Sequence, residues 1–90
     1  MIKEVKIIEQ FKGCVAYDCE SVLYVRLEKG TSVSDHVHSN KEIVFLMEGE
    51  AEAIIGDKTL IIKSPAKVEI PANTYHKFTA LTDLIGLEIK

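Results

Sequence analysis

The sequence has no long apolar run and no concentration of charge of one sign, and these absences exclude several classes of protein. No stretch approaches the roughly 18 consecutive apolar residues of a membrane-spanning helix. The first ten residues carry scattered charges instead of the apolar centre of a signal peptide. The net charge is −3 with both signs interspersed, so there is no basic stripe to neutralise nucleic-acid phosphates. We therefore expect a soluble, cytoplasmic protein that binds neither membranes nor nucleic acid.

Cysteine is also scarce, since the chain contains only Cys14 and Cys19. Their spacing fits neither a C-x-x-C redox pair nor a zinc finger. We expect both to be reduced and packed as small apolar residues, with no part in catalysis.

No window keeps the 3.6-residue periodicity of a helix, whereas alternation with a period of two recurs between turn residues. This pattern predicts an all-β barrel or sandwich, formed by a single domain over residues 1–90. Residues 1–11 are a candidate extra strand that extends the sheet in a homodimer. The strands expected after it cover residues 21–28, 43–47, 50–55, 59–62, 68–70, 76–81 and 84–89.

All three histidines fall into two short blocks of the sequence. His36 and His38 are two residues apart, so in an extended segment they project from the same face, and Glu42 follows a short polar turn. His76 must approach from a distant strand, and the interior of a closed barrel provides a convergence point. Imidazoles with a carboxylate suit Fe, Mn, Ni, Zn or Cu. Each of these residues alone would more often be an ordinary surface or hydrogen-bonded side chain, but together they indicate a divalent transition-metal site.

The charge of such a centre suggests the kind of small molecule it would bind. Four protein ligands on a six-coordinate ion leave two open positions, and a divalent ion with one carboxylate keeps a charge of about +1. That charge favours a small organic anion such as an enolate or a carboxylate.

The first block resembles the first sequence motif of the cupin superfamily, G-x5-H-x-H-x3-E-x6-G. Every fixed position of that motif is matched, by Gly30, His36, His38, Glu42 and Gly49.

The second block resembles the second cupin motif, G-x5-P-x-G-x2-H-x3-N, less completely. Pro71 and His76 match it with the correct spacing. Pro65 and Asn73 stand where glycines are usual, and Ala80 stands where an asparagine is usual. Asparagine tolerates a positive φ better than most residues, so the exchange at position 73 is mild.

The resemblance implies a single-domain cupin with a double-stranded antiparallel β-barrel, or jelly roll, of about six to eight strands. Such barrels are commonly homodimers that form by sheet extension. The resemblance also implies metal ligands at His36, His38, Glu42 and His76.

Alternation predicts which neighbouring side chains share the cavity with these ligands. Val44 and Leu46 should face inward with Glu42, and Phe78 with His76, whereas Tyr75 should point the other way. The continuous apolar run over residues 43–47 predicts a strand buried on both faces. A further pair of residues, Tyr24 and Arg26, either orients an anionic substrate or faces water.

The sequence leaves the reaction open, and no catalytic residue is identified. A metal-dependent dioxygenase is one possibility, and a non-catalytic ligand-binding or sensor module is another. A sugar isomerase is less favoured because no Arg/Lys cluster suits a phosphate. No side chain other than Glu42 presents itself as a general acid or base.

Overall fold

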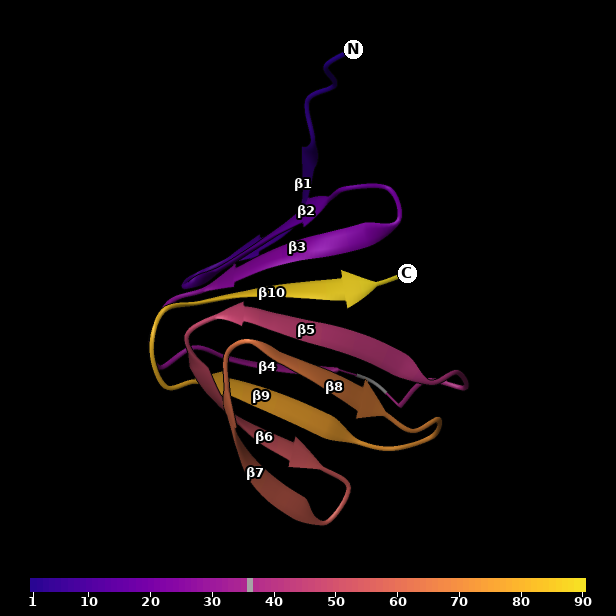
Figure 1. Cartoon of the computed structure of the whole chain (residues 1–90), viewed down its shortest axis with the longest axis vertical. Helices are drawn as coiled ribbons and strands as arrows, with labels where there is room; N and C mark the ends of the chain where they lie inside the picture. Colours follow the sequence, from indigo (N-terminus) through magenta and orange to yellow (C-terminus); the bar gives the residue numbers. More distant parts are fainter. Residues whose placement is uncertain (36) are drawn as a thin grey trace.

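The computed structural model describes residues 1–35 and 37–90, which form ten strands joined by turns and loops (Figure 1). None of these residues belongs to a helix that is long and apolar enough to cross a membrane. The strands are β1 (Lys6–Phe11), β2 (Cys14–Asp18), β3 (Val22–Leu27), β4 (Ser32–Asp35), β5 (Glu42–Glu48), β6 (Glu50–Ile55), β7 (Lys58–Lys63), β8 (Ala66–Ile70), β9 (His76–Ala80) and β10 (Leu84–Ile89).

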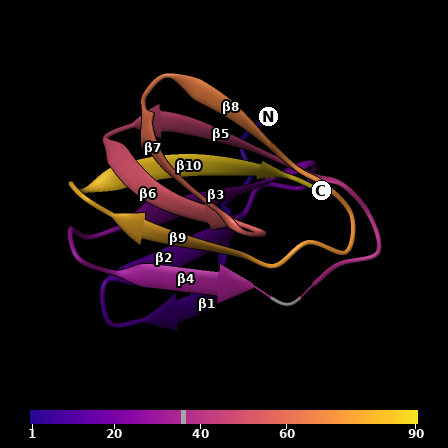
Figure 2. The ribbon, with the colours of Figure 1, turned by 90° about the horizontal axis from the view of Figure 1, so that it is seen from below.

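The strands form two antiparallel sheets that lie face to face (Figure 2). One sheet has six strands in the order β1-β2-β3-β10-β5-β8, and the other has four in the order β4-β9-β6-β7. The predicted all-β jelly-roll barrel is confirmed.

Small side chains close one end of the space between the sheets. Ala51 and Ala80 of the four-stranded sheet lie against Leu27, Leu46 and Leu84 of the six-stranded sheet in a buried cluster. Ala80 therefore occupies an apolar position, where an asparagine side chain would be buried and would need hydrogen-bond partners. The apolar environment of this position explains why it holds alanine where the second motif usually has asparagine.

Strand β5 is less buried than its apolar sequence predicts. Its inner face carries Val44 and Leu46, which line the space between the sheets as expected. On its outer face, Ile43 and Phe45 are half-buried and Met47 is exposed. The expected burial on both faces is wrong, because the two sheets pack through their inner faces and the outer face of β5 lies toward solvent.

Strand β1 covers only the second half of the candidate strand at residues 1–11, and it pairs with β2 at one edge of the six-stranded sheet. All six of its residues are exposed.

Candidate metal centre

A cavity of about 190 Å³ lies between the two sheets, and its wall is mostly apolar. Residues of all six strands of the larger sheet, β1, β2, β3, β5, β8 and β10, form one side, and residues of β4, β6, β7 and β9 form the other. The polar side chains that line it are those of Glu9, Ser34, Glu42, His76 and Glu88.

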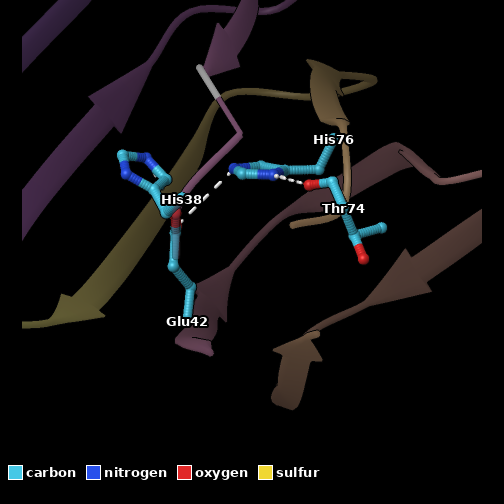
Figure 3. A network of polar contacts seen from close by, with 4 residues as sticks. All are labelled: His38, Glu42, Thr74 and His76. Atoms are coloured by element: carbon cyan, nitrogen blue, oxygen red, sulfur yellow. Dashed lines mark hydrogen bonds and ion pairs between the residues drawn. The ribbon is translucent and has the colours of Figure 1, made fainter. Parts of the chain in front are cut away.

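His76 is the buried polar residue at the start of β9, and its side chain is only 4% exposed. Its Nδ1 lies 3.2 Å from the carbonyl oxygen of Thr74, in the β8–β9 loop (Figure 3). A carbonyl oxygen can only accept, so Nδ1 carries the proton and donates it. In the neutral ring, this arrangement leaves the lone pair on Nε2, the nitrogen that faces Glu42.

Glu42 starts β5 and is 13% exposed. Its Oε2 lies 3.6 Å from His76 Nε2, and its Oε1 lies 2.9 Å from His38 Nε2 (Figure 3). Oε1 is buried and accepts no hydrogen bond from the described part of the chain. Its contact with His38 is therefore within ion-pair distance but lacks the alignment of a hydrogen bond.

His38 lies in the loop between β4 and β5, with its side chain 44% exposed. The backbone N–H of Asn73 donates a 2.6 Å hydrogen bond to the carbonyl oxygen of His38. Asn73 has a φ of 58°, so the residue that replaces the usual glycine adopts the predicted left-handed conformation. This bond joins the loop of the first motif to the loop of the second.

Three of the four predicted ligands thus come together at one end of the cavity. His38 and His76 contact opposite oxygens of Glu42, and the centroids of their rings are 6.3 Å apart. His36, the fourth, lies outside the described residues. Within residues 1–35 and 37–90, no group of three His, Cys, Asp or Glu side chains is already arranged to hold a metal ion. The ligand set stays a prediction.

The donor atoms nevertheless fit a divalent metal. A buried carboxylate oxygen without a hydrogen bond is costly and calls for a proton or a cation. Nε2 of neutral His76 and Oε2 of Glu42 are both electron-pair donors, so a cation near both would satisfy them. A hydrogen bond from the other ring nitrogen to a carbonyl is also typical of metal-binding histidines.

The predicted orientation of the neighbouring side chains is confirmed. Phe78 lines the cavity, and its ring packs edge-on against that of His76 with centroids 6.2 Å apart. Tyr75 is exposed. Arg26 is exposed and is not part of the cavity wall, so the structure supports the solvent-facing alternative for this residue.

Glu88 is a cavity residue that the sequence interpretation missed. Leu84, Gly86 and Glu88 alternate along β10 on its inner face, and all three line the cavity. Glu88 pairs with Val44 of β5 and Leu23 of β3, which line the cavity as well. The expectation that no side chain other than Glu42 presents itself as a general acid or base is therefore wrong, because Glu88 also lines the cavity. The same alternation could have shown it, since Glu88 is the polar member of the inward set.

Cys14 also lines the cavity, among the apolar residues of the buried cluster. Burial raises the pKa of its thiol above the usual range, and the nearby negative charge of Glu9 raises it further. The thiol is therefore protonated at neutral pH, which is unfavourable for a nucleophile. Both cysteines are free, as predicted.

Comparison with known proteins places the sequence and the fold in the same group. A family model described as the Cupin domain matches residues 23–89. No curated protein matches the sequence.

The structure is similar to that of the plu4264 protein from Photorhabdus luminescens, with a TM-score of 0.79 at 14% identity over 99% of this chain and 85% of that one. For KdgF from Halomonas sp. the TM-score is 0.77 at 16% identity, with 96% and 83% covered. A mutant of salicylate 1,2-dioxygenase from Pseudoaminobacter salicylatoxidans gives 0.70 at 15% identity, with 74% of this chain but 20% of the dioxygenase chain covered. At these identities the similarity shows the fold alone.

Proposed function

The chain belongs to the cupin family, and from this premise we propose that it holds a divalent transition metal in its barrel and binds a small organic anion there. The observation that carries the proposal is the contact series from Thr74 through His76 to Glu42. It fixes the tautomer of a buried imidazole so that a ring lone pair faces a buried carboxylate.

In this proposal His36, His38, Glu42 and His76 hold the metal, which is Fe, Mn, Ni, Zn or Cu. When bound, the ion supplies a Lewis-acidic centre that attracts an anionic oxygen of the ligand.

The residues of the chain itself provide the surroundings for the ligand. The Thr74 carbonyl orients His76. Phe78 and Val44 belong to an apolar wall that excludes water from the ligand and strengthens electrostatic attraction at the polar end. His38 is the most exposed of the three proposed ligands that the structure describes, so we place the entrance of the cavity beside it.

A metal-dependent dioxygenase is the catalytic form of this proposal. Three histidines with a glutamate leave open positions for a substrate and O₂. The fold is shared with a salicylate 1,2-dioxygenase, although that chain is about five times as long as the part covered here.

The second candidate is a non-catalytic ligand-binding or sensor module, which the small volume and the apolar wall of the cavity favour. A sugar isomerase acting on a phosphorylated substrate is disfavoured, because no lysine or arginine lines the cavity among the described residues.

Metal analysis of freshly purified protein tests the centre, and O₂ uptake tests the chemistry. We expect about one ion per chain, and loss of the ion in a His36→Ala/His38→Ala double variant. Full metal content in that variant would show that the ligand assignment is wrong. Loading with Fe(II) or Mn(II) and measuring O₂ uptake with enolates, catechols and diketones then separates the dioxygenase from the binding module.

We also propose a homodimer in which β1 of one chain pairs with a second copy. Ile7, Ile8 and Phe11 are exposed on this edge strand. An exposed apolar edge strand is a ready template for pairing with another chain.

A further inference from the structure

The outer faces of the two sheets differ in polarity. On the four-stranded sheet, strand pairing places polar side chains side by side, such as Glu52 with Thr79 and Lys63 with Glu50. On the six-stranded sheet, the side chains that alternate with the inward ones along β2, β3, β5 and β10 are mostly apolar or aromatic. They form an apolar face that consists of Val15, Tyr17, Val22, Tyr24, Ile43, Phe45, Met47, Ile85 and Ile89. An apolar surface of this extent marks a place where another molecule binds.

No strand or helix of the described part of the chain covers the apolar face. Residues 1–35 and 37–90 contain no helix, and their two sheets lie against each other through their inner faces (Figure 2). The side chains of the apolar face cover one another only in part. The rings of Tyr17 and Tyr24 meet edge to face with centroids 6.0 Å apart, whereas Met47 and Ile89 are 46% and 40% exposed. A second molecule is needed to bury this surface.

Two exposed side chains of opposite charge border the apolar face. Arg26 pairs with Ile85, and Ile85 pairs with Glu48 on its other side, so the three form one row across β3, β10 and β5. All three line the same groove. Arg26 and Glu48 are two strands apart, which is about 10 Å. Neither forms an ion pair within the part of the chain that the structure describes. Both charges are therefore open to a partner.

We infer that a second copy of the chain covers the apolar face, with the two-fold axis of the homodimer along β10. Rotation about β10 reverses each row, so Arg26 of each copy faces Glu48 of the other. Tyr24 and Phe45 both pair with Leu87, so they face each other in the same way. The inference rests on the proposed homodimer and names the face that it uses.

The charges select this axis among the alternatives. An axis along β3 would place Arg26 against its own copy, and an axis along β5 would do the same for Glu48. Like charges that face each other across an interface oppose association. Packed sheets of this kind cross at about 30°, so the contacts nearest β10 fit best. Arg26 and Glu48 are each only one strand away from it.

The same axis gives β1 a place in the interface. In the strand order, β1 lies three positions from β10, and β8 ends the sheet two positions away on the other side. Rotation therefore puts β1 of one copy one strand position beyond β8 of the other. Figure 1 shows that the segment before β1 extends away from both sheets. Its five residues span about 16 Å when extended, which exceeds the spacing of about 10 Å between packed sheets. This segment and β1 can thus reach the edge of β8 in the second copy.

The area of the apolar face also calls for a joint interface. Four strands about 4.8 Å apart and about 18 Å long present roughly 350 Å². A stable interface buries about 800 Å² on each partner. The apolar face supplies roughly half of this area, and β1 with the exposed Ile2 and Val5 before it supplies more.

A charge exchange tests the arrangement, with light scattering at several concentrations to measure the Kd of the dimer. Arg26→Glu would face Glu48 of the second copy, and Glu48→Arg would face its Arg26. Each unfavourable contact occurs twice in the dimer, so each variant should raise the Kd at least about tenfold. The Arg26→Glu/Glu48→Arg double variant restores opposite charges and should return the Kd to within about threefold of that of the unaltered protein.

Phe45→Asp tests the centre of the apolar face and should give the mass of one chain. Ile54→Asp is the matched control and should leave the dimer intact. Ile54 is a half-buried aliphatic residue on the outer face of the four-stranded sheet, and it pairs with Lys77 as Phe45 pairs with Lys67. Circular dichroism checks the fold of every variant, and Phe45→Ser replaces Phe45→Asp if that variant does not fold.

The outcomes separate this inference from the homodimer on which it rests. A double variant that is weaker than both single variants, or a dimer that survives Phe45→Asp, would overturn the use of the apolar face and leave a homodimer held by β1 alone. A monomer before any substitution would contradict the homodimer itself, and the apolar face would then bind a different partner. Neither result bears on the metal centre, because Arg26, Phe45 and Glu48 do not line the cavity.

Discussion

His76 Nε2 lies 3.6 Å from Glu42 Oε2, although the two residues start strands of different sheets. The contact therefore connects the four-stranded sheet to the six-stranded sheet at the polar end of the cavity. The other end is closed by the apolar cluster around Leu46 and Ala51. A cation bound at this contact would connect the two sheets at the end opposite that cluster.

Metal binding should consequently stabilise the folded barrel. An ion that binds the native state at 100 times its Kd adds about 2.7 kcal/mol to the free energy of unfolding. We expect a higher Tm when Zn²⁺ or Mn²⁺ is added, and a lower Tm after chelation. Differential scanning calorimetry with and without metal measures the shift.

The Glu42→Gln variant should lose most of this stabilisation, because it removes the anionic ligand but keeps the shape of the side chain. Glu52→Gln on the outer face of β6 should keep all of it. A metal-induced shift of the same size in both variants would rule out Glu42 as a ligand.

The backbone of Asn73 should control the approach of the two motif loops. Its φ of 58° is disfavoured for β-branched residues, and its N–H holds the His38 carbonyl. We expect Asn73→Val to reduce the free energy of unfolding by about 1–2 kcal/mol and to weaken metal binding, and Asn73→Gly to preserve both. Chemical denaturation and metal titration measure the two effects.

The same exchange in the neighbouring loop, Asn40→Val, is the control, because Asn40 has no positive φ. It should change stability by less than about 0.5 kcal/mol. If Asn73→Val is as mild as Asn40→Val, the left-handed turn does not position the site.

The sequence predicts the strands best where alternation and turn residues coincide. Residues 50–55 and 84–89 have the expected bounds, since Gly49 and Gly56 flank the first and Asp83 precedes the second. Strand β2 was missed because its outward residues, Val15 and Tyr17, are as apolar as its inward ones, which hides the alternation.

Strand β4 was missed for the opposite reason, since only one of its four residues is apolar. It is held by pairing with β9, and the hydroxyl groups of Ser32 and Thr79 lie 2.7 Å apart across that pair. Such a strand is determined by its partner and not by its own composition.

The candidate site was also predictable only in part. Motif spacing predicted that His38, Glu42 and His76 lie close together, and both histidines contact Glu42. The carbonyl of Thr74 and the carboxylate of Glu88 depend on loop geometry and strand register, which residue spacing does not report.

Cys14 should make the protein less stable at alkaline pH. Burial raises the pKa of its thiol in the folded state, whereas the unfolded thiol titrates at about 8.5. Below that pH both states hold the proton and the residue has no effect. Between about pH 8.5 and the raised folded pKa, the unfolded state releases its proton while the folded state keeps it. The free energy of unfolding therefore falls as the pH rises through this range.

Denaturation of the unaltered protein and of Cys14→Ala between pH 6 and 11 measures this contribution. Above about pH 8.5, the free energy of unfolding of the unaltered protein should fall relative to that of Cys14→Ala. Cys19→Ala serves as the control for removal of a thiol. Identical pH dependence for Cys14→Ala and the unaltered protein would show that the Cys14 thiol is no harder to ionise in the folded state.

Charge on β1 should separate the proposed homodimer. Light scattering of the unaltered protein should give about twice the chain mass of 10.1 kDa. Ile7→Lys/Ile8→Lys should give the mass of one chain, because lysines on an edge strand oppose pairing with a second copy. Leu60→Lys/Ile61→Lys is the matched control, since β7 is the edge of the other sheet and these residues are similarly exposed. A monomer before any substitution would contradict the homodimer. A dimer that is separated only by the β7 variant would place the interface at β7 instead of β1.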